Sequence, residues 1–88
     1  MFDFDAFIAL RRYTKQLNQE VDKPGVTSIG YVYRDPSGRI LGWIEEIGPE
    51  FYIVTINNVP TAAYDGVGLE ELERKLWDNH TDNLLQIA

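Results

Sequence analysis

The sequence predicts an α+β fold in which two helices flank a small antiparallel sheet. Apolar residues recur with helical spacing near the start of the chain and again from Leu69, whereas Val26 to about Tyr64 alternates with a period of two. Turn residues divide this middle segment into three or four strands. The order helix, strands, helix (α-β-β-β-(β)-α) favours a two-layer sandwich, with residues 1–88 forming one domain.

The first helix is expected from about Phe4 to Val21. Asp3 or Asp5 can cap its amino end, and Lys23-Pro24-Gly25 ends it. The expected core face holds Ala6, Phe7, Leu10, Tyr13, Thr14, Leu17 and Val21. A second stripe on the opposite side holds Phe4, Ile8, Arg11 and Lys15, flanked by Arg12. Two explanations of this stripe stay open: its apolar residues pack beneath the carboxyl-terminal tail, or it is a mixed apolar and basic contact patch.

A hairpin is expected over residues 30–46. Asp35-Pro36-Ser37-Gly38 has the composition of a type I turn and places Asp35 opposite Arg39. In that register Tyr31, Tyr33, Leu41 and Trp43 share one side of the sheet, and Gly30, Val32, Ile40, Gly42 and Ile44 share the other. Because glycines let a helix approach closely, we expect the helices on the side of the two glycines.

The rest of the chain predicts two further strands and a second helix. Residues 51–56 form the third strand, and Asn57-Asn58 turns the chain into a short fourth strand over 61–64, which Pro60 confines to a sheet edge. The second helix runs from Leu69 to about Asn79, with Leu69, Leu72 and Leu76 on one face. Residues 82–88 either add a turn of helix or dock as a tail.

The aromatic side of the hairpin has three explanations. Several exposed aromatic side chains together exceed what a monomer leaves in water. The helices cover this side after all, in a different register or layer order, or it is the seam of a homodimer, or it binds a different protein, since Tyr and Trp dominate binding hot spots.

Charge indicates what kind of partner to expect. The net charge is −6, and its distribution is uneven: residues 1–44 hold six bases and five acids, net +1, and residues 45–88 hold two bases and nine acids, net −7. Nucleic-acid binding is unlikely on this balance, because it requires clustered Lys and Arg. A basic protein is the better match.

The first residues and the apolar runs indicate a cytoplasmic protein, in a cell or an infected host. Acids precede the first short apolar run and bases follow it, which is the reverse of a signal peptide. The apolar runs are too short to span a membrane. We therefore expect no membrane attachment.

Catalytic signatures are weak. His80 is the only histidine, Ser28 and Ser37 are the only serines, and there is no cysteine. Glu45 and Glu46 are adjacent on a strand and point to opposite faces, so they do not form a close carboxylate pair. We expect no enzyme, no metal and no cofactor.

The element order resembles that of double-stranded-RNA-binding domains over Phe4 to Asn79. The resemblance implies a basic start to the last helix, for RNA phosphate. Here that position is Leu69-Glu70-Glu71, which argues against RNA.

The sequence thus predicts a non-enzymatic protein-interaction module, which acts as an inhibitor by charge mimicry, in the manner of a viral protein, if its basic partner binds nucleic acid. The predicted partner-binding residues are Tyr31, Tyr33, Trp43, Glu45, Glu46, Glu50, Glu70, Glu71, Glu73 and Asp78, with Asp65 and Asp82 adding to the acidic field. The alternative is a binder of small ligands or single-stranded nucleic acid that uses the aromatic sheet face for stacking.

Overall fold

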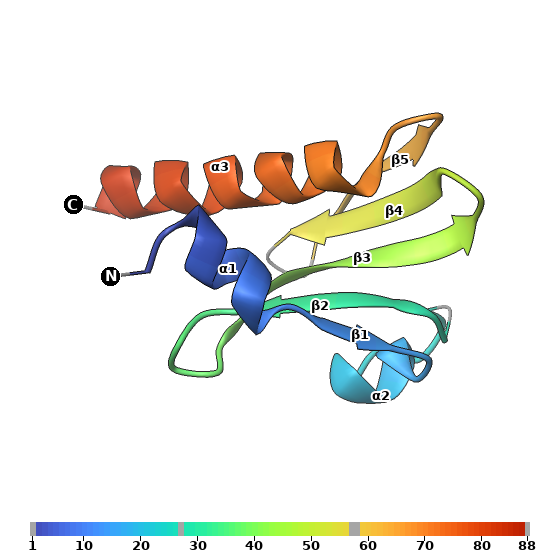
Figure 1. Ribbon diagram of the computed structural model, residues 1–88. Coiled ribbons are helices and arrows are strands. Elements are labelled where there is room, and N and C mark those ends of the chain that lie inside the picture. The colour runs from blue at the N-terminus through green and yellow to red at the C-terminus, as the bar shows by residue number, and fades with distance from the viewer. Residues whose placement is uncertain (1, 27, 57–58, 88) are drawn as a thin grey trace.

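A five-stranded antiparallel sheet carries helices at both ends of the chain, which confirms the α+β class (Figure 1). The computed structural model describes residues 2–26, 28–56 and 59–87, without the side chains of 59–62 and 83–87. The elements are α1 (Phe4–Leu10), β1 (Arg12–Thr14), α2 (Leu17–Glu20), β2 (Gly30–Arg34), β3 (Ile40–Gly48), β4 (Phe51–Ile56), β5 (Val59–Asp65) and α3 (Leu69–Ile87). The strands lie in the order of the chain, β1-β2-β3-β4-β5.

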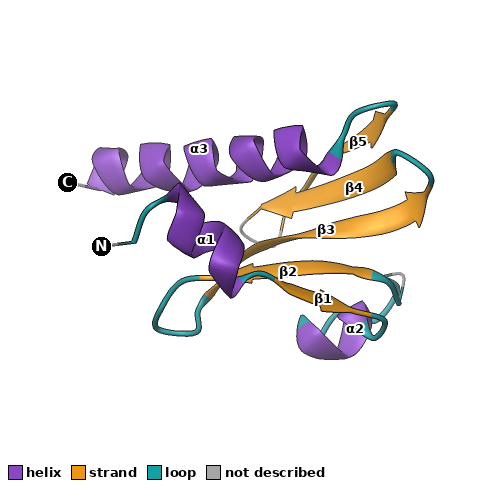
Figure 2. Ribbon diagram, viewed as in Figure 1, coloured by secondary structure: helices purple, strands orange, loops and turns teal. Residues whose placement is uncertain are grey.

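Each face of the sheet carries a hydrophobic core within one chain. Helices α1 and α3 lie over one face, here called the helix face, and the short α2 lies beside β1 and β2 (Figure 2). The core on the helix face is formed by Phe7, Tyr33, Leu41, Ile44, Val54, Leu72 and Leu76. A smaller core on the opposite face, here called the reverse face, is formed by Leu17, Val21, Val32 and Trp43. The aromatic side chains of the hairpin are therefore divided between two cores.

The expected hairpin register is wrong beyond the turn, because β3 contains a bulge. The turn itself is as predicted: the Asp35 N–H donates to the Arg39 carbonyl oxygen at 3.0 Å. The register then shifts so that Tyr33 pairs with Gly42. Leu41 is the extra residue, and a shift by one residue moves every later side chain of β3 to the other face. Trp43 consequently lies opposite Val32 on the reverse face.

Gly30 and Gly42 each lie beneath a helix, but on opposite faces. A Cβ atom on Gly42 would lie 2.6 Å from the Thr55 carbonyl oxygen and 2.9 Å from Leu76 Cδ2 of α3. A Cβ atom on Gly30 would lie 2.6 Å from Leu17 Cδ2 of α2. The expectation of close helix approach is correct for both glycines, and their placement on one face is wrong.

The expected single helix from Phe4 to Val21 is wrong, because its apolar residues serve two cores. Phe7 packs on the helix face, whereas Leu17 and Val21 pack on the reverse face. One straight helix cannot reach both sides of a sheet. The chain instead ends α1 at Leu10 and passes through the edge strand β1, whose Tyr13 pairs with Tyr31.

The carboxyl-terminal half follows the predictions more closely. Strand β4 has the predicted bounds, and β5 is an edge strand, as Pro60 requires. The Asn57-Asn58 turn lies outside the described residues. Helix α3 continues through Ile87, which settles the carboxyl-terminal segment up to that residue as helix.

Candidate binding groove

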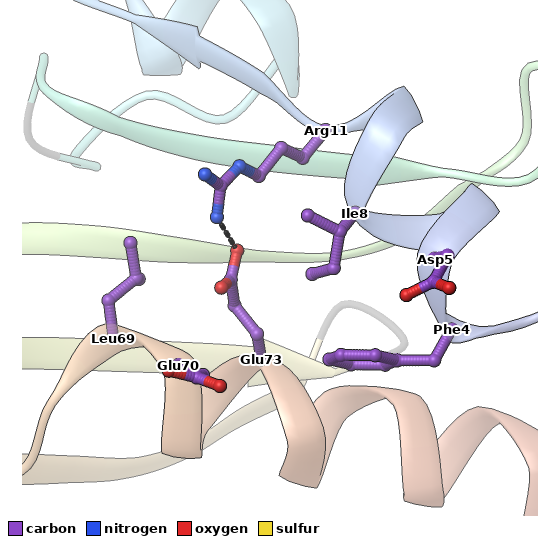
Figure 3. A pocket seen from close by; sticks show the side chains of 7 residues that line it. All are labelled: Phe4, Asp5, Ile8, Arg11, Leu69, Glu70 and Glu73. Carbon is purple, nitrogen blue, oxygen red and sulfur yellow. Dashed lines mark hydrogen bonds and ion pairs between the residues drawn. The ribbon is translucent and has the colours of Figure 1, made fainter.

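A groove of about 480 Å³ lies between α1 and α3 (Figure 3). It is lined by Phe4, Asp5, Ile8, Arg11, Leu69, Glu70 and Glu73. Its volume falls within the range of small-molecule and side-chain pockets. The lining combines apolar side chains with three carboxylates and one guanidinium, so its net charge is −2.

The α1 wall of the groove is the second stripe identified in the sequence. The Asp3 carboxylate accepts a hydrogen bond from the Ala6 N–H at 2.9 Å, which caps α1 and fixes where it begins. Phe4 and Ile8 are one turn apart, so both point towards α3 (Figure 3). Arg11 follows in extended conformation and also points towards α3. Phe4, Ile8 and Arg11 of the stripe thus line a cavity, whereas Lys15 and the flanking Arg12 are not part of its lining.

The α3 wall is formed by the first turns of that helix. Leu69 and Glu73 are four residues apart and lie on one helix face, with Glu70 beside them. Glu73 is only 3% exposed, although it was predicted as a surface acid. It reaches from α3 towards Arg11 (Figure 3).

A buried polar network closes one end of the groove. The Glu73 Oε2 atom accepts hydrogen bonds from the Arg11 guanidinium and, at 2.7 Å, from the Tyr33 hydroxyl. The hydrogen bond to Glu73 raises the pKa of Arg11, and burial together with Glu73 raises the pKa of Tyr33. Arg11 therefore stays charged and Tyr33 stays neutral. The network joins α1, β2 and α3 across the helix face.

Two arginines also contact aromatic rings beside the groove. The Arg74 guanidinium carbon lies 3.8 Å from the centre of the Phe4 ring, and that of Arg11 lies 5.6 Å from the centre of the Tyr31 ring. Both distances are typical of cation–π contacts. Two guanidinium groups of the chain itself thus lie against aromatic rings beside the groove.

Asp5 and Glu70 place two exposed carboxylates at the groove. Both are exposed, one on each wall of the groove. Neither forms an ion pair within the part of the chain that the structure describes. The groove therefore offers an apolar surface flanked by two free carboxylates, an arrangement that suits a cationic side chain with an aliphatic stem.

His80 lies away from this groove. The centre of its ring lies 5.9 Å from the centre of the Phe2 ring and 5.7 Å from that of the Trp77 ring. Burial lowers the pKa of His80. Among the described residues, no three His, Cys, Asp or Glu side chains come close enough to hold a metal ion.

The predicted aromatic partner-binding residues do not form one exposed surface. Tyr33 is 0% exposed and Trp43 is 3% exposed, and only Tyr31 remains partly exposed. Of the three explanations of the aromatic side, coverage by the helices in a shifted register holds for Tyr33, and α2 covers Trp43. A homodimer stays a prediction.

The predicted acidic residues are divided between core and surface. Glu45 is buried, like Glu73, which contradicts the prediction that both belong to the surface field. The exposed or partly exposed members are Glu46, Glu50, Asp65, Glu70, Glu71, Asp78 and Asp82. Of these, Glu70 alone lines the groove. Sequence reasoning missed Asp5, although its place one residue from Phe4 in the second stripe was a usable signal.

Comparison of the sequence with protein-family models and with curated proteins, and of the structure with solved structures, finds no significant match. Within the described residues, no helix is both long enough and apolar enough to cross a bilayer.

Proposed function

We propose that this chain is a non-enzymatic interaction protein that binds a basic protein partner, with the groove between α1 and α3 as its anchor point. The observation that carries the proposal is the pair of free carboxylates, Asp5 and Glu70, on opposite walls of a partly apolar groove. The net charge of −6 adds a long-range attraction for the same kind of partner.

The groove replaces the exposed aromatic face as the apolar part of the interaction. Ile8 and Leu69 provide apolar surface for the methylene groups of a Lys or Arg side chain, and the carboxylates accept its polar head. If the partner binds nucleic acid through the same basic segment, occupation of that segment by this chain would exclude the nucleic acid. An inhibitory role of the chain would operate in this way.

The test is binding of a short fluorescein-labelled peptide of alternating arginine and leucine, measured by fluorescence anisotropy. Asp5→Asn and Glu70→Gln should each weaken binding about fivefold, which corresponds to about 1 kcal/mol for a partly exposed ion pair. Asp22→Asn is the matched control, because Asp22 is exposed, lies outside the groove and has a positive φ that Asn also adopts. It should change binding by less than twofold.

Two results would overturn the proposal. One is an equal effect of Asp5→Asn, Glu70→Gln and Asp22→Asn, because attraction would then depend on net charge alone. The other is failure of the peptide to bind at millimolar concentration in low salt. A circular dichroism spectrum of each variant, compared with that of the unaltered protein, shows whether the fold is retained.

A further inference from the structure

The groove contains a site for a guanidinium group, and a residue of the chain itself fills it. Arg11 places its guanidinium against the Glu73 carboxylate and above the Tyr31 ring. The Tyr33 hydroxyl holds the same carboxylate oxygen from the other side. A carboxylate with an aromatic face beside it is the environment that favours arginine over lysine, because guanidinium is planar and only weakly hydrated.

The residue that fills the site is partly exposed to water. The Arg11 side chain is 36% exposed, whereas that of Glu73 is 4% exposed. Arg11 lies at the end of α1, and its long side chain can turn into water without disturbing the backbone. The carboxylate is the fixed part of the site and the guanidinium is the exchangeable part.

Exchange of one guanidinium for another would leave the balance of charge at Glu73 unchanged. A buried carboxylate that loses its partner is strongly unfavourable, so any group that displaces Arg11 must itself be a cation that donates hydrogen bonds. The released Arg11 would be solvated in water. Glu70 lies three residues before Glu73 on the same helix face, so the residues next to an incoming arginine would meet a second carboxylate.

We propose that the groove recognises an arginine of its basic partner, and that this arginine takes the place of Arg11 on Glu73. This inference rests on the proposed function and deepens it, because it names the side chain that is recognised. Arg11 then acts as an internal competitor that lowers the affinity of the groove and selects against partners that carry only lysine.

The first experiment measures the affinity of Arg11→Ala for the arginine–leucine peptide and for a lysine–leucine peptide of the same length. Removal of the competitor should strengthen binding of the arginine peptide on the order of tenfold, and it should strengthen binding of the lysine peptide clearly less. Equal gains for both peptides, or no gain, would overturn the inference. Arg11→Lys keeps the charge and should give an intermediate affinity.

The second experiment tests whether the site that Arg11→Ala leaves open binds a guanidinium group. Because it compares thermal midpoints of the same variant, it remains valid if Arg11→Ala is less stable than the unaltered protein. Agmatine carries a guanidinium and an ammonium group, and putrescine, with two ammonium groups, is its charge-matched control. Agmatine should raise the thermal midpoint of Arg11→Ala more than putrescine does, and the difference should vanish in the double variant with Glu73→Gln. Equal effects of the two amines would show that Glu73 does not select guanidinium.

The third measurement uses the unaltered protein. The Arg11 Nε–H resonance should shift towards that of a solvent-exposed arginine when the arginine peptide saturates the groove. An unchanged resonance at saturation would overturn the exchange. If Asp5→Asn and Glu70→Gln still weaken binding in that case, the groove remains the binding site and only the exchange is wrong; if they do not, the proposed function itself fails.

Discussion

Substitution of Trp43 by alanine should destabilise the whole protein, because the bulge in β3 turns this side chain into the reverse-face core. Trp43 is 3% exposed and packs with Leu17, Val21 and Val32. A buried tryptophan removes roughly 150–250 Å² from water, and Trp→Ala in a core costs about 3–5 kcal/mol. The lower end applies here, because the short α2 above it can relax into part of the space.

This loss is a large part of the total free energy of unfolding of the protein. At about 0.05–0.15 kcal/mol per residue, 88 residues give roughly 4–13 kcal/mol of stability. With a denaturant slope of about 1.5 kcal/mol per molar urea, a loss of about 3 kcal/mol lowers the unfolding midpoint by about 2 M. Urea titration followed by far-ultraviolet circular dichroism measures this midpoint.

Leu10→Ala is the matched control, because Leu10 is 44% exposed at the end of α1. The substitution should lower the free energy of unfolding by less than about 1 kcal/mol, because the site is exposed. If Trp43→Ala lost no more stability than Leu10→Ala, Trp43 would have to be on the surface. That result would refute the reverse-face core.

Three further predictions test other parts of the fold. Tyr33→Phe removes the hydroxyl that donates to Glu73 and should cost about 1.5–3 kcal/mol in urea titration, whereas Tyr31→Phe, which leaves that hydrogen bond in place, should cost clearly less. Gly42→Ala forces a Cβ atom against the Thr55 carbonyl oxygen and Leu76 Cδ2 of α3 and should cost about 1–3 kcal/mol, and an unchanged midpoint would contradict the close approach of these two atoms. Burial lowers the pKa of His80 below its ordinary value of 6.5, so the unfolded chain binds the proton more readily. Stability from this group is therefore complete above pH 6.5 and declines as the pH falls through and below that value, and His80→Gln should remove this part of the pH dependence.

Local turn and cap chemistry was predictable from the sequence, because each such feature depends on a few neighbouring residues. Asp35 and Gly38 form the expected turn, with Gly38 at φ +91°, and Asp3 caps α1 as one of the two residues named for that role. The strand over residues 51–56 also has the predicted bounds. Each of these depends on composition within one element.

The position of Leu41 in a bulge was not predictable in the same way. Ile40, Leu41 and Gly42 are all compatible with a regular strand, and with Leu41 as the extra residue Gly42 lies beneath Leu76 of α3. The error then spread along the strand, because a shift of one residue exchanges the two faces for every later side chain. Trp43 was placed on the same side as Tyr31 and Tyr33 for this reason, whereas it lies on the opposite side, next to Val32.

Of the two walls of the candidate groove, the α1 wall was predictable from the sequence. The stripe with Phe4, Ile8 and Arg11 is visible in the sequence as a helical pattern, and it does line the groove. Its partner Glu73 is 62 residues away from Arg11, and it sits among exposed acids on α3. The helical spacing of α3 places Glu73 on the face that Leu69, Leu72 and Leu76 share, which was a usable signal of its burial. Its pairing with Arg11, and with it the groove, depends on tertiary contact.

Every strand of the sheet lies next to its neighbour in the chain. Because each strand pairs with the next one along the chain, the sheet can zip up through short loops, which favours rapid folding. The contact between α1 and α3 is different, since it joins segments separated by nearly the whole sheet. During synthesis the sheet can form while the α3 wall of the groove is still missing, so the groove is complete only when residues 69–87 emerge and dock.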